Sequence, residues 1–113
     1  MSVPVLKNYI NGQWVDSAAS EFSEVRNPAT GELLARVPMS GAAEVDAAAH
    51  AARKAFDGWR RVPVLERTAA LGRLKELILK HYDEIAETLT REHGKIKSEA
   101  LTELQRAVDN INV

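Results

Sequence analysis

The longest hydrophobic pattern in the chain lies between Pro63 and His93. Its apolar residues recur at the spacing that places side chains on one face of a helix: Leu71, Leu74, Ile78, Ile85 and Leu89. Charged residues occupy the opposite face, so the pattern predicts one long amphipathic helix, or two helices with Asp83 capping the second. Gly94 would end this helical region. If Leu74 lies in a core, its replacement by alanine should cost about 2–5 kcal/mol.

Two β-hairpins are predicted ahead of this region. Asn11-Gly12 lies between the apolar-rich segments 7–10 and 13–15, and this dipeptide suits a type I′ turn because both central residues need positive φ. Segments 22–26 and 33–37 form a second pair, joined by the turn 27–32. We expect Asn27, Pro28 and Gly31 to shape that turn, without a ligand.

Two further helices complete the predicted elements. One is expected over residues 42–59, capped by Ser40 or Gly41, and another from about Glu99. The apolar pattern of the last helix is still running at Val113, which we interpret as a truncation or a cleavage. The fold class is therefore α+β: two short hairpins followed by three or four helices. We divide the chain into hairpins over 1–41 and a helical part over 42–113.

Composition limits the chemistry that the chain can support. The 113 residues carry a net charge of −1 and include no cysteine, which excludes disulfides, cysteine nucleophiles and thiolate metal sites within the chain. The scattered basic residues argue against nucleic-acid binding. No apolar run is long enough to span a bilayer and no secretory signal is evident, so we expect a cytoplasmic protein with no membrane partner.

No constellation of catalytic side chains is evident. His50, His81 and His93 are far apart in the sequence and lack metal-ligand spacing. No glycine-rich phosphate-binding motif occurs, and the acidic residues of the helical region suit surface ion pairs. We therefore assign no catalytic and no cofactor-binding residue to this chain.

Taken in order, several short motifs resemble those of aldehyde dehydrogenases. The first hairpin, Tyr9-Ile10-Asn11-Gly12-Gln13-Trp14, is similar to the opening hairpin of that superfamily, and Asn27-Pro28-Ala29-Thr30-Gly31-Glu32 resembles its early turn. The segments Val45–Trp59, Glu92-His93-Gly94-Lys95 and Glu99–Ala107 resemble its first helices. The resemblance covers nearly the whole chain from Tyr9 onward and rests on the order of these motifs.

This resemblance implies a longer parent protein with a Rossmann-like α/β domain that binds NAD or NADP. The parent would oxidise an aldehyde through a cysteine located downstream, so the present chain would be structural and inactive alone. Val37-Pro38-Met39-Ser40 and Val62-Pro63-Val64 look most like the CoA-acylating methylmalonate-semialdehyde dehydrogenase branch, with hydrolytic aldehyde and succinate-semialdehyde dehydrogenases as alternatives. Some members hold a monovalent cation through an acidic side chain, for which Glu103 is the counterpart.

A different class of function is also open, namely a self-standing α+β module that binds a partner helix through its apolar stripe. The two interpretations differ in whether the chain covers its own apolar faces. If it does not, exposed patches promote association, and we expect a homo-oligomer such as a domain-swapped dimer.

Overall fold

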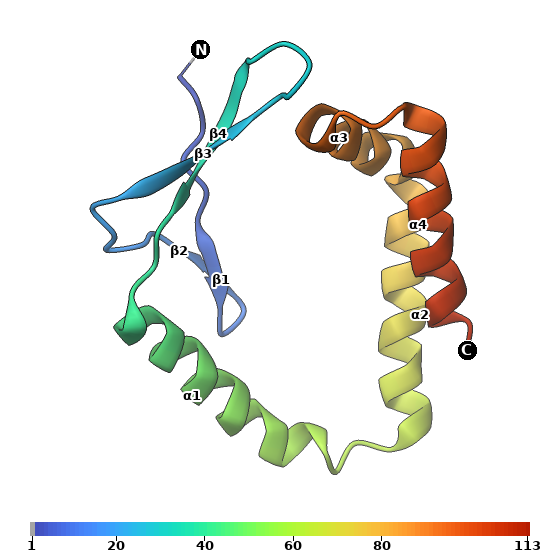
Figure 1. Cartoon of the computed structure of the whole chain (residues 1–113). Coiled ribbons are helices and arrows are strands. Elements are labelled where there is room, and N and C mark those ends of the chain that lie inside the picture. Colours follow the sequence, from blue (N-terminus) through green and yellow to red (C-terminus); the bar gives the residue numbers. More distant parts are fainter. Residues whose placement is uncertain (1) are drawn as a thin grey trace. The chain divides into compact units, whose positions relative to one another are not determined.

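The computed structural model describes residues 2–113 and shows an α+β chain, as predicted (Figure 1). Its elements are β1 (Asn8–Ile10), β2 (Gln13–Val15), β3 (Phe22–Arg26), β4 (Leu33–Pro38), α1 (Ala42–Trp59), α2 (Val64–Lys80), α3 (Tyr82–His93) and α4 (Lys97–Ile111). The chain forms two compact units. The first holds the four strands and α1, and the second holds the turn 27–31 with α2, α3 and α4. The division at residue 41 stays a prediction.

The first hairpin has the turn that its sequence predicts. Asn11 and Gly12 have φ values of 53° and 75°, and Ile10 pairs with Gln13 across a two-residue loop. Positive φ at both positions gives the type I′ twist that matches the flanking strands. β1 begins at Asn8, one residue later than expected, and β2 has the predicted bounds.

The second hairpin is also confirmed, with β4 one residue longer than predicted. In its connecting turn, the backbone N–H of Gly31 donates to the Asn27 carbonyl at 2.8 Å, and that of Ala29 donates to Asn27 Oδ1 at 2.9 Å. Gly31 has φ 75°, a conformation that favours glycine. A bulge between Val25 and Arg26 shifts the register next to this turn.

An N-terminal segment adds to this hairpin in a way that the sequence did not predict. Val5 forms a parallel bridge with Arg36 of β4. The N–H of Leu6 donates to the Arg36 carbonyl, and the N–H of Arg36 donates to the Pro4 carbonyl, both at 2.9 Å. These bonds use the free edge of β4, which would otherwise leave backbone groups without partners in the sheet.

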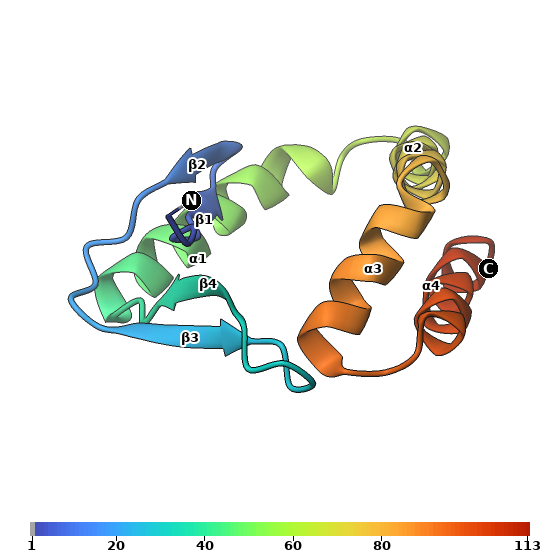
Figure 2. The ribbon, with the colours of Figure 1, turned by 90° about the horizontal axis from the view of Figure 1, so that it is seen from above.

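The second unit is a packed set of three helices. α3 contacts α4, and α2 contacts both (Figures 1 and 2). The break between α2 and α3 falls at His81, so the two-helix alternative is correct. His81, rather than Asp83, is the N-cap residue of α3, and Asp83 lies within the first turn. Gly94 ends α3 with φ 85°, as predicted.

The last helix starts earlier than expected. α4 begins at Lys97 rather than near Glu99, because Ile96 has extended backbone and its carbonyl already accepts from the N–H groups of Glu99 and Ala100. Sequence periodicity does not locate this boundary, since the first helical turn carries only polar and small residues.

Small side chains form the buried core of the two units. Among residues 2–113 the buried residues are Ala35, Pro38, Ala86, Ala100 and Val108, and no large side chain is fully buried. Ala86 and Ala100 lie on α3 and α4, so these two helices approach closely. Two leucines of the predicted stripe remain partly exposed, Leu71 by 49% and Leu74 by 47%, and Leu77 on the same helix is 54% exposed.

Because Leu74 is half exposed, Leu74→Ala should lower the free energy of unfolding of this chain by only about 1 kcal/mol or less. Val108 is only 5% exposed, so Val108→Ala should cost about 2 kcal/mol. Urea unfolding of the two variants in parallel measures both values. A larger loss for Leu74→Ala than for Val108→Ala would show that the stripe is covered.

Candidate functional site

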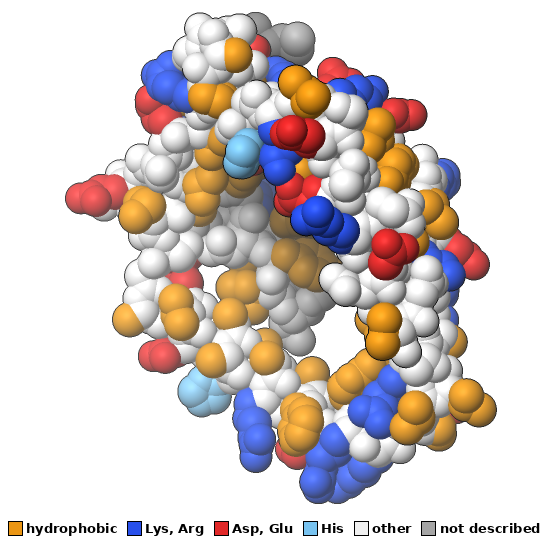
Figure 3. Space-filling view, turned by 45° about the vertical axis from the view of Figure 1, so that its right-hand side comes forward, with side chains coloured by type: hydrophobic (Ala, Val, Ile, Leu, Met, Phe, Trp, Pro, Cys, Tyr) orange, Lys and Arg blue, Asp and Glu red, His pale blue; other side chains and the backbone are white. Residues whose placement is uncertain are grey.

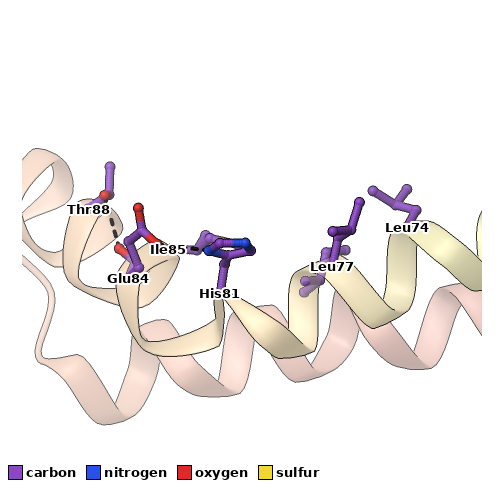
Figure 4. A pocket seen from close by; sticks show the side chains of 7 residues that line it. Leu74, Leu77, His81, Glu84, Ile85 and Thr88 are labelled. Atoms are coloured by element: carbon purple, nitrogen blue, oxygen red, sulfur yellow. Dashed lines mark hydrogen bonds and ion pairs between the residues drawn. The ribbon is translucent and has the colours of Figure 1, made fainter.

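A groove lies in the second unit where α2 ends and α3 begins. Its volume is about 350 Å³, and it is lined by Leu74, Leu77, Ile78, His81, Glu84, Ile85 and Thr88. Figure 4 shows Leu74 and Leu77 projecting from α2, with His81 and Glu84 beside each other at the start of α3. The break at His81 brings faces of two helices to one concave surface, which an unbroken helix would not form.

The polar side chains of this groove are engaged with one another. His81 Nδ1 lies 2.9 Å from Glu84 Oε2, and the Thr88 hydroxyl donates to the Glu84 carbonyl at 3.0 Å. Both members of the His81–Glu84 pair are well exposed, so the pair contributes little to stability. The Thr88 hydroxyl donates to a backbone carbonyl, and no side-chain base is placed to activate it. The groove therefore offers a binding surface rather than a nucleophile.

The second unit also holds Glu103, the residue implied as a cation ligand. Its carboxylate accepts a hydrogen bond from Lys95 Nζ and forms an ion pair with it, which lowers the pKa of Glu103. Within the described part of the chain no group of three His, Asp or Glu side chains could hold a metal ion. The ammonium group supplies the positive charge at this carboxylate, and the cation role of Glu103 stays a prediction.

In the first unit, the Glu44 carboxylate connects the start of α1 with the loop before β3. Glu44 Oε2 accepts from the Ser17 hydroxyl at 2.9 Å and from the Gly41 N–H at 3.2 Å, while Oε1 accepts from the Ala18 N–H at 3.2 Å. Asn8 Nδ2 donates to the Ser40 hydroxyl at 2.8 Å and brings β1 to the same place. This network is a structural clasp around the N-terminus of α1.

The hydrogen bond from Ser17, followed by those from Gly41 and Ala18, lowers the pKa of Glu44, with desolvation acting in the opposite direction. A carboxyl group whose folded-state pKa is lowered stabilises the fold above its unfolded pKa, and this contribution is lost as the pH falls through the folded value. We therefore expect the free energy of unfolding to decrease as the pH is lowered below about 4.3, the ordinary pKa of a glutamate side chain.

Urea unfolding at a series of pH values tests this expectation. Glu44→Gln should flatten the acid limb of the stability profile, because its side chain does not titrate. An unchanged acid limb in this variant would contradict the role of the clasp.

The three histidines do not converge in the structure. His50 Nδ1 on α1 lies 3.0 Å from the Asp46 carbonyl, His81 pairs with Glu84, and His93 lies in the last turn of α3. Glu44 lies in the first turn of α1, where the sequence alone predicts only a favourable interaction of its charge with the helix N-terminus. The spacing of Gly41 and Glu44 contained the signal for the backbone bond, but Ser17 is too distant in sequence to be found by such a pattern.

Hydrophobic side chains are common on the surface of both units (Figure 3). The most exposed large ones include Trp14 at 70% and Leu65 at 83%. Tyr9 and Trp14 pack their rings against each other, with centroids 4.9 Å apart, on one face of the first hairpin. Among residues 2–113, no helix is both long enough and apolar enough to cross a membrane.

The model of the aldehyde dehydrogenase family matches residues 14–113. The chain belongs to the aldehyde dehydrogenase family. Solved aldehyde dehydrogenases contain the same backbone fold, and this chain corresponds to the N-terminal part of their structure. The resemblance inferred from the order of the short motifs is therefore confirmed.

Relatives of this family include malonate- and methylmalonate-semialdehyde dehydrogenases. Malonate-semialdehyde dehydrogenase 3 of Geobacillus kaustophilus is 48% identical over 104 residues, which are 92% of this chain and 22% of that protein. A methylmalonate-semialdehyde dehydrogenase structure from Oceanimonas doudoroffii matches 98% of this chain and 22% of its own, with TM-score 0.90 and 38% identity. An NAD-dependent benzaldehyde dehydrogenase from Corynebacterium glutamicum matches 93% of this chain and 23% of its own, with TM-score 0.89 and 36% identity.

Proposed function

We propose that the chain is the N-terminal scaffold of an NAD(P)-dependent dehydrogenase that oxidises malonate or methylmalonate semialdehyde. The observation that carries this proposal is the family match over residues 14–113. Support for the substrate comes from the 48% identity to a malonate-semialdehyde dehydrogenase and from the 38% identity to a methylmalonate-semialdehyde dehydrogenase. The chain spans 22% of the length of each of these proteins.

In this proposal the present residues support the reaction without taking part in it. The chain contains no cysteine, so the nucleophilic thiolate belongs to another part of the enzyme. No glycine-rich phosphate cradle occurs in the sequence, and the principal NAD(P) contacts likewise belong elsewhere. The hairpins and helices act as a scaffold against which the dinucleotide-binding part of the fold packs, and the chain alone is inactive.

The identity of the acyl acceptor is part of the same proposal. CoA resolves the acyl-enzyme in the branch that we favour, whereas water does so in hydrolytic aldehyde and succinate-semialdehyde dehydrogenases. The assay is aldehyde-dependent NADH or NADPH formation by the enzyme that carries this segment, with malonate, methylmalonate and succinate semialdehydes and with benzaldehyde. Acyl-CoA formation from a malonate-type substrate supports the proposal. Preference for succinate semialdehyde or benzaldehyde, or a free acid as the product in the presence of CoA, contradicts it.

Self-association in the cytoplasm is a further element of the proposal. The exposed leucines of α2 and the exposed Trp14 leave apolar surface that a second copy can cover. Sedimentation velocity over a range of concentrations should show a dimer or a larger species. A monomer at all concentrations contradicts this element and leaves the enzymatic assignment to be tested separately by the assay.

The groove between α2 and α3 favours a second candidate function, a self-standing interaction module. Its apolar lining, with Glu84 at the rim, suits an amphipathic helix that carries a basic residue. This alternative predicts that the chain binds such a helix without any other part of an aldehyde dehydrogenase. The scaffold proposal predicts no such binding.

A further inference from the structure

The turn of the first hairpin contains a reactive pair of residues that the proposed function does not use. Asn11 is followed by Gly12, and both are exposed. We infer that Asn11 is a site of spontaneous modification, at which the side-chain amide is lost and a mixture of aspartate and isoaspartate is formed. The inference is independent of the enzymatic activity of the parent protein.

Both reacting groups are unengaged within the described residues. The Asn11 side-chain amide forms no hydrogen bond there, and neither does the Gly12 backbone N–H. A Cβ placed at Gly12 would meet nothing within 4 Å, so neighbouring atoms do not shield this side of the turn. Glycine also brings no side chain to hinder approach of its nitrogen to the Asn11 carboxamide carbon.

The other four asparagines are protected in distinct ways. Asn27 precedes Pro28, which has no backbone N–H to act as the nucleophile. Asn8 Nδ2 donates to Ser40 at 2.8 Å, and Asn112 Oδ1 accepts from Lys75 at 2.9 Å. Asn110 lies in α4, where the helix fixes the backbone. Asn11 alone combines a following glycine, exposure and an unbonded amide.

The chemical step balances with water as the only co-reactant. The Gly12 backbone nitrogen loses its proton to solvent base and attacks Asn11 Cγ, so a C–N bond forms while the Cγ–Nδ2 bond breaks and ammonia leaves. The product is a five-membered cyclic imide. Water then opens either carbonyl of this ring, which gives aspartate in one case and isoaspartate, with the main chain running through Cβ, in the other.

Opening of the hairpin controls the rate. The native turn holds Asn11 at φ 53° and restricts the rotation that ring closure requires. However, β1 and β2 have three residues each and form a separate two-stranded sheet, so few backbone hydrogen bonds hold the turn, although β1 also contacts α1. Local opening of such a unit needs little free energy, so the reactive conformation is visited without global unfolding.

The two products differ in what they do to the hairpin. Asp-Gly suits a type I′ turn, so the aspartate form keeps the pairing of Ile10 with Gln13. Isoaspartate adds one atom to the main chain within a two-residue loop, where the loop length fixes the register. We therefore expect the isoaspartate form to lose the β1–β2 pairing and the Tyr9–Trp14 ring contact.

The test is to age the purified chain in mildly alkaline buffer, with and without urea. Peptide mass spectrometry locates the mass gain at each asparagine, and enzymatic methylation of isoaspartate quantifies that product. Asn11 should react several-fold faster than the other four asparagines, and urea should accelerate its reaction. Gly12→Asn is the matched control, because asparagine tolerates positive φ but adds a side chain next to the nucleophile; it should slow the reaction several-fold.

The structural half of the inference is tested on the separated products. NMR contacts between the Tyr9 and Trp14 rings should be lost in the isoaspartate form and kept in the variant Asn11→Asp. Modification of Asn110 at the same rate as Asn11, or no acceleration by urea, overturns the assignment of a site controlled by the hairpin. Ring contacts that persist in the isoaspartate form overturn the structural consequence.

Discussion

Gly94→Ala is expected to lower the free energy of unfolding by about 2–4 kcal/mol. Two effects combine at this position. Gly94 has φ 85°, a conformation that is strained for any residue with a Cβ. A Cβ built there would lie 2.8 Å from Pro28 Cγ, which is closer than van der Waals contact allows. Pro28 Cγ cannot easily move away from the added Cβ, because it belongs to a pyrrolidine ring that is closed onto the backbone.

The matched control is Gly72→Ala. Gly72 lies inside α2, and nothing approaches within 4 Å of its added Cβ. Alanine at this position should stabilise the chain by about 0.5–1 kcal/mol through its higher helix propensity. In urea unfolding, Gly94→Ala should lower the midpoint concentration and Gly72→Ala should raise it. A neutral Gly94→Ala would mean that the 27–31 turn does not pack on the end of α3.

Ala100→Glu is expected to have the largest effect of any single substitution considered, a loss of about 3–5 kcal/mol. Ala100 lies on α4 and is fully buried, with 0% exposure. A carboxylate at this position must either lose its hydration without a cation to pair with it, or force α4 away from α2 and α3. Either outcome removes the packing that holds the second unit together.

The control for charge alone is Ala69→Glu, since Ala69 is exposed on α2. This variant should change the free energy of unfolding by no more than about 0.5 kcal/mol. Circular dichroism during thermal unfolding distinguishes the two variants, and Ala100→Glu should lose its cooperative transition. A cooperative transition near that of the unmodified chain would show that α4 is not packed as described.

Local features of the fold were predictable because short-range chemistry determines them. Asn11-Gly12 specified its turn through the need for positive φ at two successive residues, and Gly94 specified the end of α3 in the same way. The helix over 42–59 was predicted with its observed bounds because polar and small residues bracket a clear apolar stripe. These signals lie within a few residues of the feature that they determine.

Features that depend on distant residues were not predictable. The bridge between Val5 and Arg36 joins segments that no local pattern relates. The Glu44 clasp likewise depends on Ser17, which is brought to α1 by the preceding hairpin. Burial of small residues was likewise not predictable: Ala86 and Ala100 are fully buried, but alanine has no sequence pattern that distinguishes a buried position from an exposed one.

The groove at His81 shows why sites are harder to predict than elements. The sequence allowed a break in the helical region but did not say that both helices would present apolar faces to one concavity. His81 and Glu84 are three residues apart and would also be neighbours on an unbroken helix, but the break makes His81 the residue at which α2 ends and α3 begins. Family membership was easier to recognise, because it depends on the order of motifs along the chain and not on their arrangement in space.

A segment exchange tests the central claim most directly. Residues 14–113 of this chain would replace the corresponding segment of malonate-semialdehyde dehydrogenase 3 of Geobacillus kaustophilus, with the native enzyme rebuilt in the same way as the control. Because this chain is 48% identical to that enzyme over 104 residues, we expect a folded chimera that oxidises malonate semialdehyde at a rate comparable with the control. A chimera that folds but has no activity, or that fails to fold while the control succeeds, would contradict the assignment of this chain as an aldehyde dehydrogenase scaffold.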